Sequence, residues 1–318
     1  MTSAPKAGIV VVGSLNADLT IYCDRLPQPG ETVHGNGFAV NPGGKSANQA
    51  VAASKLGGQV TLIGAVGDDP NGTMLLDSTA NAGVDVSRVL RCDVATGVAV
   101  ISVDSSGENS IIISAGANGT LRPADVTPDA FQNAAVVCLC LEVGIDTVIA
   151  AAQAGHDAGA TVLLNVSPYA EVPERLAGLG DVLLVNAHEA SLFLGAEAEI
   201  PDADAGAEAW EPVRSQFAER GLQRILVTLG AQGSVVLDSL ARGIEDQITR
   251  IAPTRVSAVD TTGAGDAFTG AVAARLAAGE SLAAAASFAS VAAALAATKK
   301  GTQAAYPTIA DVEQLRGA

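Results

Sequence analysis

The sequence has few cysteines, few aromatic residues and no long uninterrupted hydrophobic run. Four cysteines in 318 residues are too few for the disulfide framework of a secreted scaffold, so we expect free, buried thiols in a reducing cytoplasm. No apolar run reaches the roughly 20 residues of a membrane span. The apolar residues 8–13 predict a first β-strand rather than a signal peptide, whose apolar region would be longer. These absences predict a cytoplasmic location and no membrane partner.

Positive charge is also scarce. Lys and Arg number 18 against 34 Asp and Glu, which gives a net charge of −16. Such a chain would repel the phosphates of nucleic acids and of anionic membranes, so neither is expected as a partner. If the protein handles an anionic nucleotide, it must gather its few positive groups at the site that binds the nucleotide.

Apolar β-rich segments alternate with helical patterns along nearly the whole chain. This alternation predicts an α/β fold with a mainly parallel central sheet, covered by helices on both faces. Residues 18–41 and 96–114 break the alternation, because each predicts strands with no helix between them. We expect them to form a small antiparallel sheet that projects as a lid from a single domain spanning 1–318. The expected strands are 8–13, 60–66, 136–141, 161–166, 181–185, 225–229 and 234–238, with a further strand ending at 256–260; the expected helices are 46–57, 70–82, 146–158, 205–220, 264–278, 281–298 and 308–316.

The segment DTTGAGDAF at 260–268 carries the strongest functional signal. Gly263, Ala264 and Gly265 have little side chain to cover their backbone N–H groups, which can therefore point outward at the start of a helix. The helix dipole favours an anion at the same place, and Asp266 adds a carboxylate beside it. An anion cradle with a base at its rim suits phosphoryl transfer to an alcohol. A glycine-rich helix start with Asp266 as a simple capping group is the alternative.

A second glycine-rich segment, NPGGKS at 41–46, also precedes a predicted helix. It is similar to a Walker A loop, but that loop needs a glycine where Ala39 stands and a buried strand before it. The alternative is a turn at Gly44 that brings the backbone close to a polyhydroxylated ligand. Lys45 and Asn48 lie one helical turn apart, so both can reach such a ligand from one face.

Polar residues near the ends of two apolar strands suit a sugar. Asn16 and Asp18 are alternate residues, so in an extended chain both point to one side and can bind paired hydroxyls. A turn satisfied by Asx side chains explains them equally well. Glu142 follows an apolar strand, at the edge of the parallel sheet where α/β folds bind their ligands.

Two later strand ends suit a nucleotide. Asn186 and Glu189 offer an amide and a carboxylate near a possible Mg²⁺, an ion that keeps most of its waters and takes few protein ligands. Thr228, Gly230 and Gly233 form a strand–turn–strand pattern that permits close approach by a phosphate or a base. A tight hairpin without a ligand explains the glycines equally well.

Taken together and in this order, these motifs resemble the ribokinase branch of the PfkB carbohydrate kinase family. The resemblance runs from GSLNAD at 13–18 to TKKG at 298–301 and rests mainly on GGKSANQA at 43–50 and the segment 260–268. It implies a ribokinase-like three-layer α/β/α fold and ATP-dependent phosphorylation of the terminal hydroxyl of a pentose, with D-ribose as the leading candidate. It also implies Asp266 as the base, and a homodimer formed through the lid sheet.

The same resemblance implies roles for other residues. The backbone N–H groups of Gly263, Ala264 and Gly265 would hold the transferred phosphoryl group. The sugar contacts would be Asn16, Asp18, Gly44, Lys45, Asn48, Glu142 and Asp266. The nucleotide contacts would be Asn186, Thr228, Gly230, Gly233, Gly265 and Ser290. Asn186 and Glu189 would lie near a hydrated Mg²⁺, and a K⁺ ion would take ligands from Asp260, Thr262, Ala296, Lys299 and Gly301.

Several positions depart from the usual pattern of the family, among them Ser46, Ser290 and Ala305. Ser46 replaces a glycine and would crowd the sugar or add a hydroxyl contact. Ser290 replaces a larger Asn or His beside the adenine, and Ala305 replaces a serine that helps to bind K⁺. These departures leave 2-deoxyribose, another furanose or a nucleoside as alternative acceptors. A sensor that binds sugar and nucleotide without turnover is a further alternative, which the intact Asp266 disfavours.

Overall fold

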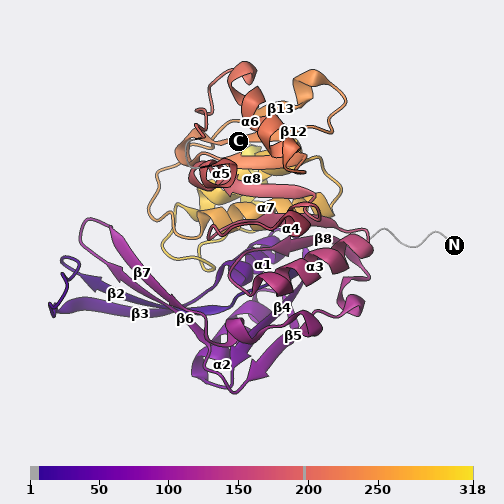
Figure 1. Cartoon of the computed structure of the whole chain (residues 1–318). Coiled ribbons are helices and arrows are strands. Elements are labelled where there is room, and N and C mark those ends of the chain that lie inside the picture. Colours follow the sequence, from indigo (N-terminus) through magenta and orange to yellow (C-terminus); the bar gives the residue numbers. More distant parts are fainter. Residues whose placement is uncertain (1–6, 196–197, 318) are drawn as a thin grey trace.

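The structure, a computed structural model, describes residues 7–195 and 198–317. The main sheet runs in the order β13 (Ile248–Ile251), β12 (Ser234–Asp238), β11 (Arg224–Thr228), β10 (Val182–Asn186), β9 (Thr161–Asn165), β8 (Ala134–Leu139), β1 (Gly8–Val12), β4 (Gln59–Gly67) and β5 (Asp85–Cys92) (Figure 1). From β11 to β5 every neighbouring pair of strands is parallel, whereas β12 pairs antiparallel with both β11 and β13. This arrangement confirms the predicted α/β class.

Helices cover both faces of this sheet and give the three layers that the resemblance implied. Successive strand residues point to opposite faces, so Val11 joins one buried apolar cluster and Val12 the other. Among the described residues, no helix is both long and apolar enough to cross a membrane. The first cluster contains side chains of α1 (Lys45–Lys55), α2 (Pro70–Asn81), α7 (Ala264–Ala277), α8 (Leu282–Ala296) and α9 (Ile309–Arg316); the second contains those of α3 (Ile145–Asp157), α4 (Glu174–Ala177), α5 (Ala187–Leu194) and α6 (Ala207–Glu219).

Helices α1 and α7 lie unusually close together because Gly270 has no side chain. A Cβ atom at Gly270 would lie 2.5 Å from the carbonyl oxygen of Gln49 and 2.7 Å from the Cβ of Ala52. Such distances are shorter than any normal van der Waals contact. The close approach brings the first turn of α7, with Asp266, against the first turns of α1.

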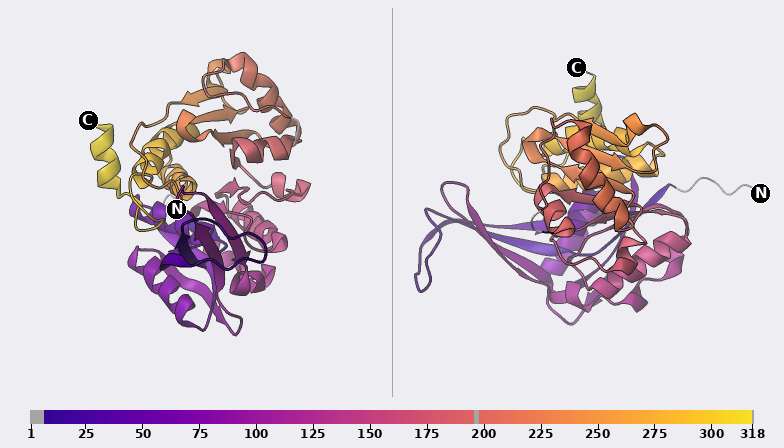
Figure 2. Two further views of the ribbon diagram at one scale, coloured as in Figure 1. Left: turned by 90° about the vertical axis from the view of Figure 1, so that its left-hand side faces the viewer. Right: turned by 45° about the horizontal axis from the view of Figure 1, so that its top comes forward.

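A second sheet, which we call the lid sheet, projects from one side of the main sheet (Figures 1 and 2). Two antiparallel hairpins form it, and their two inner strands pair in parallel. Its strands leave large apolar side chains in solvent, among them Phe38 at 64% and Ile112 at 71% exposure. The lid sheet has the order β3 (Gly35–Gly43), β2 (Asn16–Cys23), β6 (Gly97–Val103) and β7 (Asn109–Ser114).

The strand end predicted at 256–260 is wrong. The last strand, β13, ends at Ile251, and residues 252–263 contain neither helix nor strand. The backbone N–H groups of Val259 and Asp260 donate to the carbonyl of Ala297, at the end of α8, rather than to a neighbouring strand. The segment therefore crosses the end of α8 before it reaches α7.

Candidate active site

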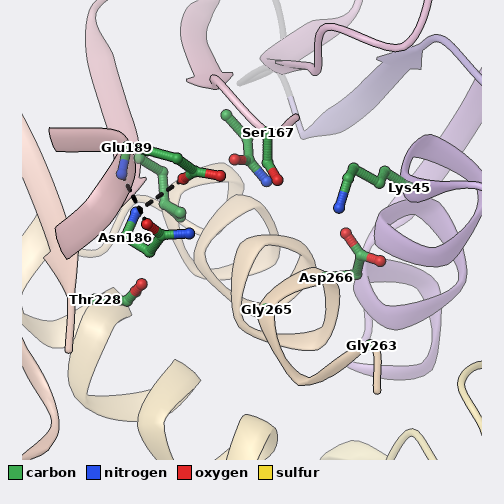
Figure 3. Close-up of a pocket in the computed structure, with 10 residues that line it drawn as sticks. Lys45, Ser167, Asn186, Glu189, Thr228, Gly263, Gly265 and Asp266 are labelled. Atoms are coloured by element: carbon green, nitrogen blue, oxygen red, sulfur yellow. Dashed lines mark hydrogen bonds between the residues drawn. The ribbon is translucent and has the colours of Figure 1, made fainter. Parts of the chain in front are cut away.

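The N-terminus of α7 opens into a cavity of about 180 Å³ at the carboxyl ends of the parallel strands. The residues predicted from separate motifs meet there, as Figure 3 shows. Lys45 comes from α1, Glu189 from α5 and Asp266 from α7. The predicted residues that line the cavity are Lys45, Asn186, Glu189, Thr228, Gly263, Gly265 and Asp266.

The start of α7 requires glycine at position 263. Gly263 is the N-cap, with φ 74° in the left-handed region, and a Cβ atom there would lie 2.7 Å from the Tyr306 hydroxyl oxygen. The N–H groups of Gly263 and Gly265 donate to no other described residue, whereas that of Ala264 donates to the carbonyl of Thr261. Two of the three predicted cradle donors are therefore free to bind an anion.

Asp266 lies in the first turn of α7, and its side chain is buried. Burial raises the pKa of its carboxyl group, and the charge of Glu142 acts in the same direction. The ammonium of Lys45 opposes this rise, as do the side-chain amides of Asn48 and Gln49, which donate to Asp266 Oδ2 at 3.0 Å and Oδ1 at 3.1 Å. Gln49 was not among the predicted site residues.

Three carboxylates share this part of the site. Burial, followed by the charges of Glu142 and Asp266, raises the pKa of Asp18 to about 7, although Lys45 lowers it. Burial by itself would lower the pKa of Lys45, but the attraction of Asp266 and Glu142 raises it. Lys45 is therefore held in its charged form by the carboxylates that it faces.

The raised pKa of Asp18 predicts a pH-dependent stability. A carboxyl group whose pKa is higher in the folded than in the unfolded protein contributes stability that is fully present below the unfolded pKa of 3.8 and is lost as pH rises from there through about 7. We therefore expect Asp18→Asn to raise Tm at pH 8 by about 3 °C or more, and by clearly less at pH 5, where the loss is only partial. Thermal unfolding of the unliganded proteins at both pH values tests this. The same Tm difference at both pH values would contradict the raised pKa of Asp18.

Hydrogen bonds orient two of the predicted sugar contacts, Asn16 and Glu142. Asn118, which was not among the predicted site residues, donates from Nδ2 to Asn16 Oδ1 at 2.8 Å, so the amide nitrogen of Asn16 remains available as a donor. The backbone N–H of Lys45 donates to Glu142 Oε2 at 3.1 Å, so Glu142 lies at the N-terminus of α1. At Gly44, φ is 89°, and a Cβ atom would lie 2.6 Å from the Asn16 nitrogen.

Asn186 and Glu189 form a capping box at the start of α5. The N–H of Glu189 donates to Asn186 Oδ1, and the N–H of Asn186 donates to Glu189 Oε2, both at 2.9 Å. These bonds orient both side chains beside the cavity (Figure 3). Each side chain keeps oxygen lone pairs for a hard cation such as Mg²⁺ or for its water shell.

The strand–turn–strand at 228–234 has the predicted form. Thr228 ends β11, and a 3₁₀ turn over Gly230–Gln232 leads into β12. At Gly233, φ is 99°, and a Cβ atom would lie 2.3 Å from the carbonyl oxygen of Ile251. The glycine at 233 therefore allows the turn to lie against the end of β13.

The predicted K⁺ ligands lie in two segments, 260–262 before α7 and 296–301 from the last residue of α8, which Asp260 joins. Its Oδ1 accepts from the N–H of Thr262 and its Oδ2 from the N–H of Gly301, both at 2.9 Å. Gly301 has φ 91°, and Lys299 donates from its backbone to the carbonyl of Ala296 at 3.3 Å. These residues offer carboxylate and carbonyl oxygens, the donor type that fits an alkali cation.

The hydroxyl groups of the two substituted serines form hydrogen bonds with other groups of the protein. Ser46 is fully buried, and its Oγ lies 3.0 Å from Cys140 Sγ. The expectation that Ser46 crowds or contacts the sugar is therefore not met, because its side chain points into the core. The Ser290 hydroxyl donates to the carbonyl of Ala252 at 3.1 Å and accepts from the N–H of Thr254 at 3.3 Å, so it anchors the segment after β13.

Three comparisons place the chain among known proteins. A ribokinase of Haemophilus influenzae is 36% identical over 303 residues, covering 94% of this chain and 95% of its own. A deoxyribokinase of Salmonella typhi is 35% identical over 305 residues, covering 95% and 96%. The structure of Arabidopsis thaliana ribokinase complexed with ribose and ATP has a TM-score of 0.87 and 32% identity, and covers 97% of this chain and 98% of that one. The model of the pfkB family carbohydrate kinases matches residues 6–309, and the chain belongs to that family.

Proposed function

We propose that this carbohydrate kinase transfers the γ-phosphoryl group of ATP to the terminal hydroxyl of D-ribose, giving D-ribose 5-phosphate. The observation that carries the proposal is a buried carboxylate, Asp266, beside free backbone N–H groups at the start of α7. A base and an anion site at this spacing suit an alcohol that attacks a phosphoryl group. The similarity to ribokinases over nearly the whole chain supports ribose as the acceptor.

In this mechanism Asp266 accepts the proton of the attacking hydroxyl. The N–H groups of Gly263 and Gly265 hold the phosphoryl oxygens, and that of Ala264 can join them if it leaves the Thr261 carbonyl. The loose character of phosphoryl transfer makes alignment and charge neutralisation more important than the strength of the base. Lys45, which faces the cavity, supplies positive charge near the reacting groups (Figure 3).

The substrates would lie on either side of the α7 N-terminus. On the sugar side, Asp18 and Glu142 accept hydrogen bonds from hydroxyl groups, Asn16 and Asn48 donate to them, and Gly44 allows close approach. On the nucleotide side we place Asn186, Thr228, Gly230 and Gly233 against ATP, and Ser290 acts through the segment that it anchors. A bound Mg²⁺ would neutralise phosphate charge, and Asn186 and Glu189 would hold its water shell.

The test is ADP release from MgATP across a panel of sugars and nucleosides, with and without K⁺. Fastest turnover on D-ribose supports the proposal. Fastest turnover on 2-deoxyribose would keep the mechanism and change the acceptor, and the Salmonella typhi deoxyribokinase makes this the second candidate. Binding of nucleotide without turnover on any acceptor would favour a sensor and overturn the proposal.

A K⁺ ion would set the conformation of the α7 N-terminus. Its ligands would come from Asp260, Thr262, Ala296, Lys299 and Gly301. Asp260 connects the two segments in the structure, and Ala305 offers no side-chain oxygen. We expect Asp260→Ala to reduce the stimulation of kcat by K⁺ at least about threefold, because two loop contacts and one ligand are lost. Initial rates over a K⁺ series, at constant ionic strength, measure this. An unchanged K⁺ response would remove Asp260 from the ion site.

The lid sheet supports a homodimer as the working form. It exposes Phe38, Ile111 and Ile112, and exposed apolar side chains on strands favour pairing with a second copy. Sedimentation equilibrium gives the solution mass, and a monomer at micromolar concentration would contradict this assembly. We also propose a cytoplasmic location, which the four free cysteines support.

A further inference from the structure

Two side-chain amides hold the carboxylate of Asp266, one on each oxygen. Asn48 donates to Oδ2 at 3.0 Å and Gln49 donates to Oδ1 at 3.1 Å. Both amides come from α1, and their residues are adjacent in sequence. The close contact of α1 with α7 at Gly270 makes this arrangement possible.

Each of these amides is itself oriented by a partner behind it. Gln303 donates from Nε2 to Asn48 Oδ1 at 3.0 Å, and the Cys138 thiol donates to Gln49 Oε1 at 3.3 Å. An amide whose oxygen accepts from one side must present its NH₂ group to the other side. Asp266 therefore faces two donors, an arrangement that favours the charged carboxylate, which accepts at both oxygens.

Gln303 is held firmly enough to act in this way. It is 4% exposed and lies between α8 and α9. The Lys55 ammonium donates to the Gln303 carbonyl at 2.7 Å and to the Tyr306 carbonyl at 3.2 Å. The Ser78 hydroxyl donates to Gln303 Oε1 at 3.4 Å, so the glutamine amide cannot turn over without losing a partner at each end.

We propose that Gln49 and Gln303 are positioning residues that hold the Asp266 carboxylate, directly and through Asn48 respectively, in the charged and oriented form that a base needs. This inference rests on the proposed function of Asp266. We assign neither glutamine a contact with the substrates, because Gln49 is fully buried and the amide of Gln303 is bonded at both ends, to Asn48 and to Ser78. Their effect on the reaction is therefore exerted through the base.

The surroundings of Asp266 explain why it needs such support. The charged or titratable groups that face it are Lys45 on α1, Glu142 after β8, Asp18 on β2, the Tyr306 hydroxyl after α8 and Cys138 on β8. Lys45 favours the charged carboxylate, whereas burial, Glu142 and Asp18 oppose it. Hydrogen bonds to a charged acceptor are stronger than neutral ones, so loss of one donor should shift the balance towards the protonated acid.

The test compares Gln49→Met and Gln303→Met, which keep side-chain length and remove the donor. The measurement is the pH profile of kcat/KM for ribose at saturating MgATP, which reports groups of the enzyme–MgATP complex that binds the sugar. We expect the acidic limb to move to higher pH by about one unit in Gln49→Met, which loses a direct donor to Asp266. The shift should be smaller in Gln303→Met, because Asn48 keeps its NH₂ group and loses only the partner that orients it. At high pH both variants should recover kcat/KM for ribose to within about threefold of the parent enzyme. Gln216→Met, a change on the exposed side of α6, is the matched control and should leave the profile unchanged.

A purely structural role would give a different result. Lower rates at every pH, with the acidic limb unmoved in both variants, would overturn the inference. If the buried Gln49→Met protein does not fold, Gln303→Met decides, since its residue lies outside the α1–α7 contact. Asp266→Asn, measured over the same pH range, separates the two proposals. Turnover in Asp266→Asn would refute the role of Asp266 as the base. If Asp266→Asn is inactive but the acidic limb of the pH profile does not move in either glutamine variant, only the positioning role is refuted.

Discussion

Replacement of Asp266 by Asn should lower kcat at least about 10²-fold and leave ATP affinity nearly unchanged. The amide has the shape of the carboxylate but cannot accept a proton at neutral pH. Its NH₂ group would also face one of the two donors, Asn48 or Gln49, where the carboxylate offers an acceptor to each. Initial rates with ribose and calorimetric titration with a non-hydrolysable ATP analogue measure the two quantities.

The matched control is Asp77→Asn, which changes an exposed carboxylate of α2 and should leave kcat unchanged. A thermal melt of Asp266→Asn guards against loss of the fold. Turnover close to that of the parent enzyme would remove Asp266 from the role of base. A large loss of ATP affinity with kcat preserved would instead place the carboxylate on the nucleotide side.

Replacement of Lys45 by Met should reduce kcat/KM for the sugar at least about 10²-fold, with a smaller effect on the KM for ATP. Lys45 faces Asp18, Glu142 and Asp266, and its positive charge lowers the pKa of Asp18 and opposes the rise at Asp266. Without it, both carboxyl groups should take up protons at higher pH. Steady-state kinetics with each substrate varied in turn give the two KM values.

The Lys45 variant also distinguishes the two interpretations of the segment NPGGKS. A Walker A lysine acts on the nucleotide phosphates, so an effect confined to the KM for ATP would restore that interpretation. Lys45→Arg tests the contribution of charge, and we expect it to recover part of the loss at the sugar. Equal activity in Lys45→Met and the parent enzyme would show that the charge is not used.

Most elements could be predicted from the sequence because their signals are local. The helix over Pro70–Asn81, for example, begins with an Asp69 cap and a proline in its first turn, as a helix start requires. The buried strands read as short apolar runs between turns. The strand predicted at 256–260 failed for a non-local reason, since its backbone donors bond to Ala297 at the end of α8.

The candidate site was likewise predictable only where its signals are local in sequence. Glycines at strand ends and helix starts mark close backbone approaches, so Gly44, Gly233 and Gly263 were found from sequence, and their contacts in the structure explain them. Ser46 was found too, but its direction was not, because Cys140 lies 94 residues away in sequence. Gln49 was not predicted although it follows Asn48, since nothing local distinguishes a glutamine that bonds to a buried carboxylate from one on a helix surface.

The amino-acid sequence by itself determined the α/β class, the start of α7 with its carboxylate and uncovered backbone N–H groups, and the set of polar residues at the strand ends, because each depends on residues close together in the chain. Only the tertiary structure decided which partners those groups take. Asp266 meets Gln49 across 217 residues, and Asn48 meets Gln303 across 255. Such pairings depend on how α1, α7 and the segment before α9 pack together, and no local pattern records that packing.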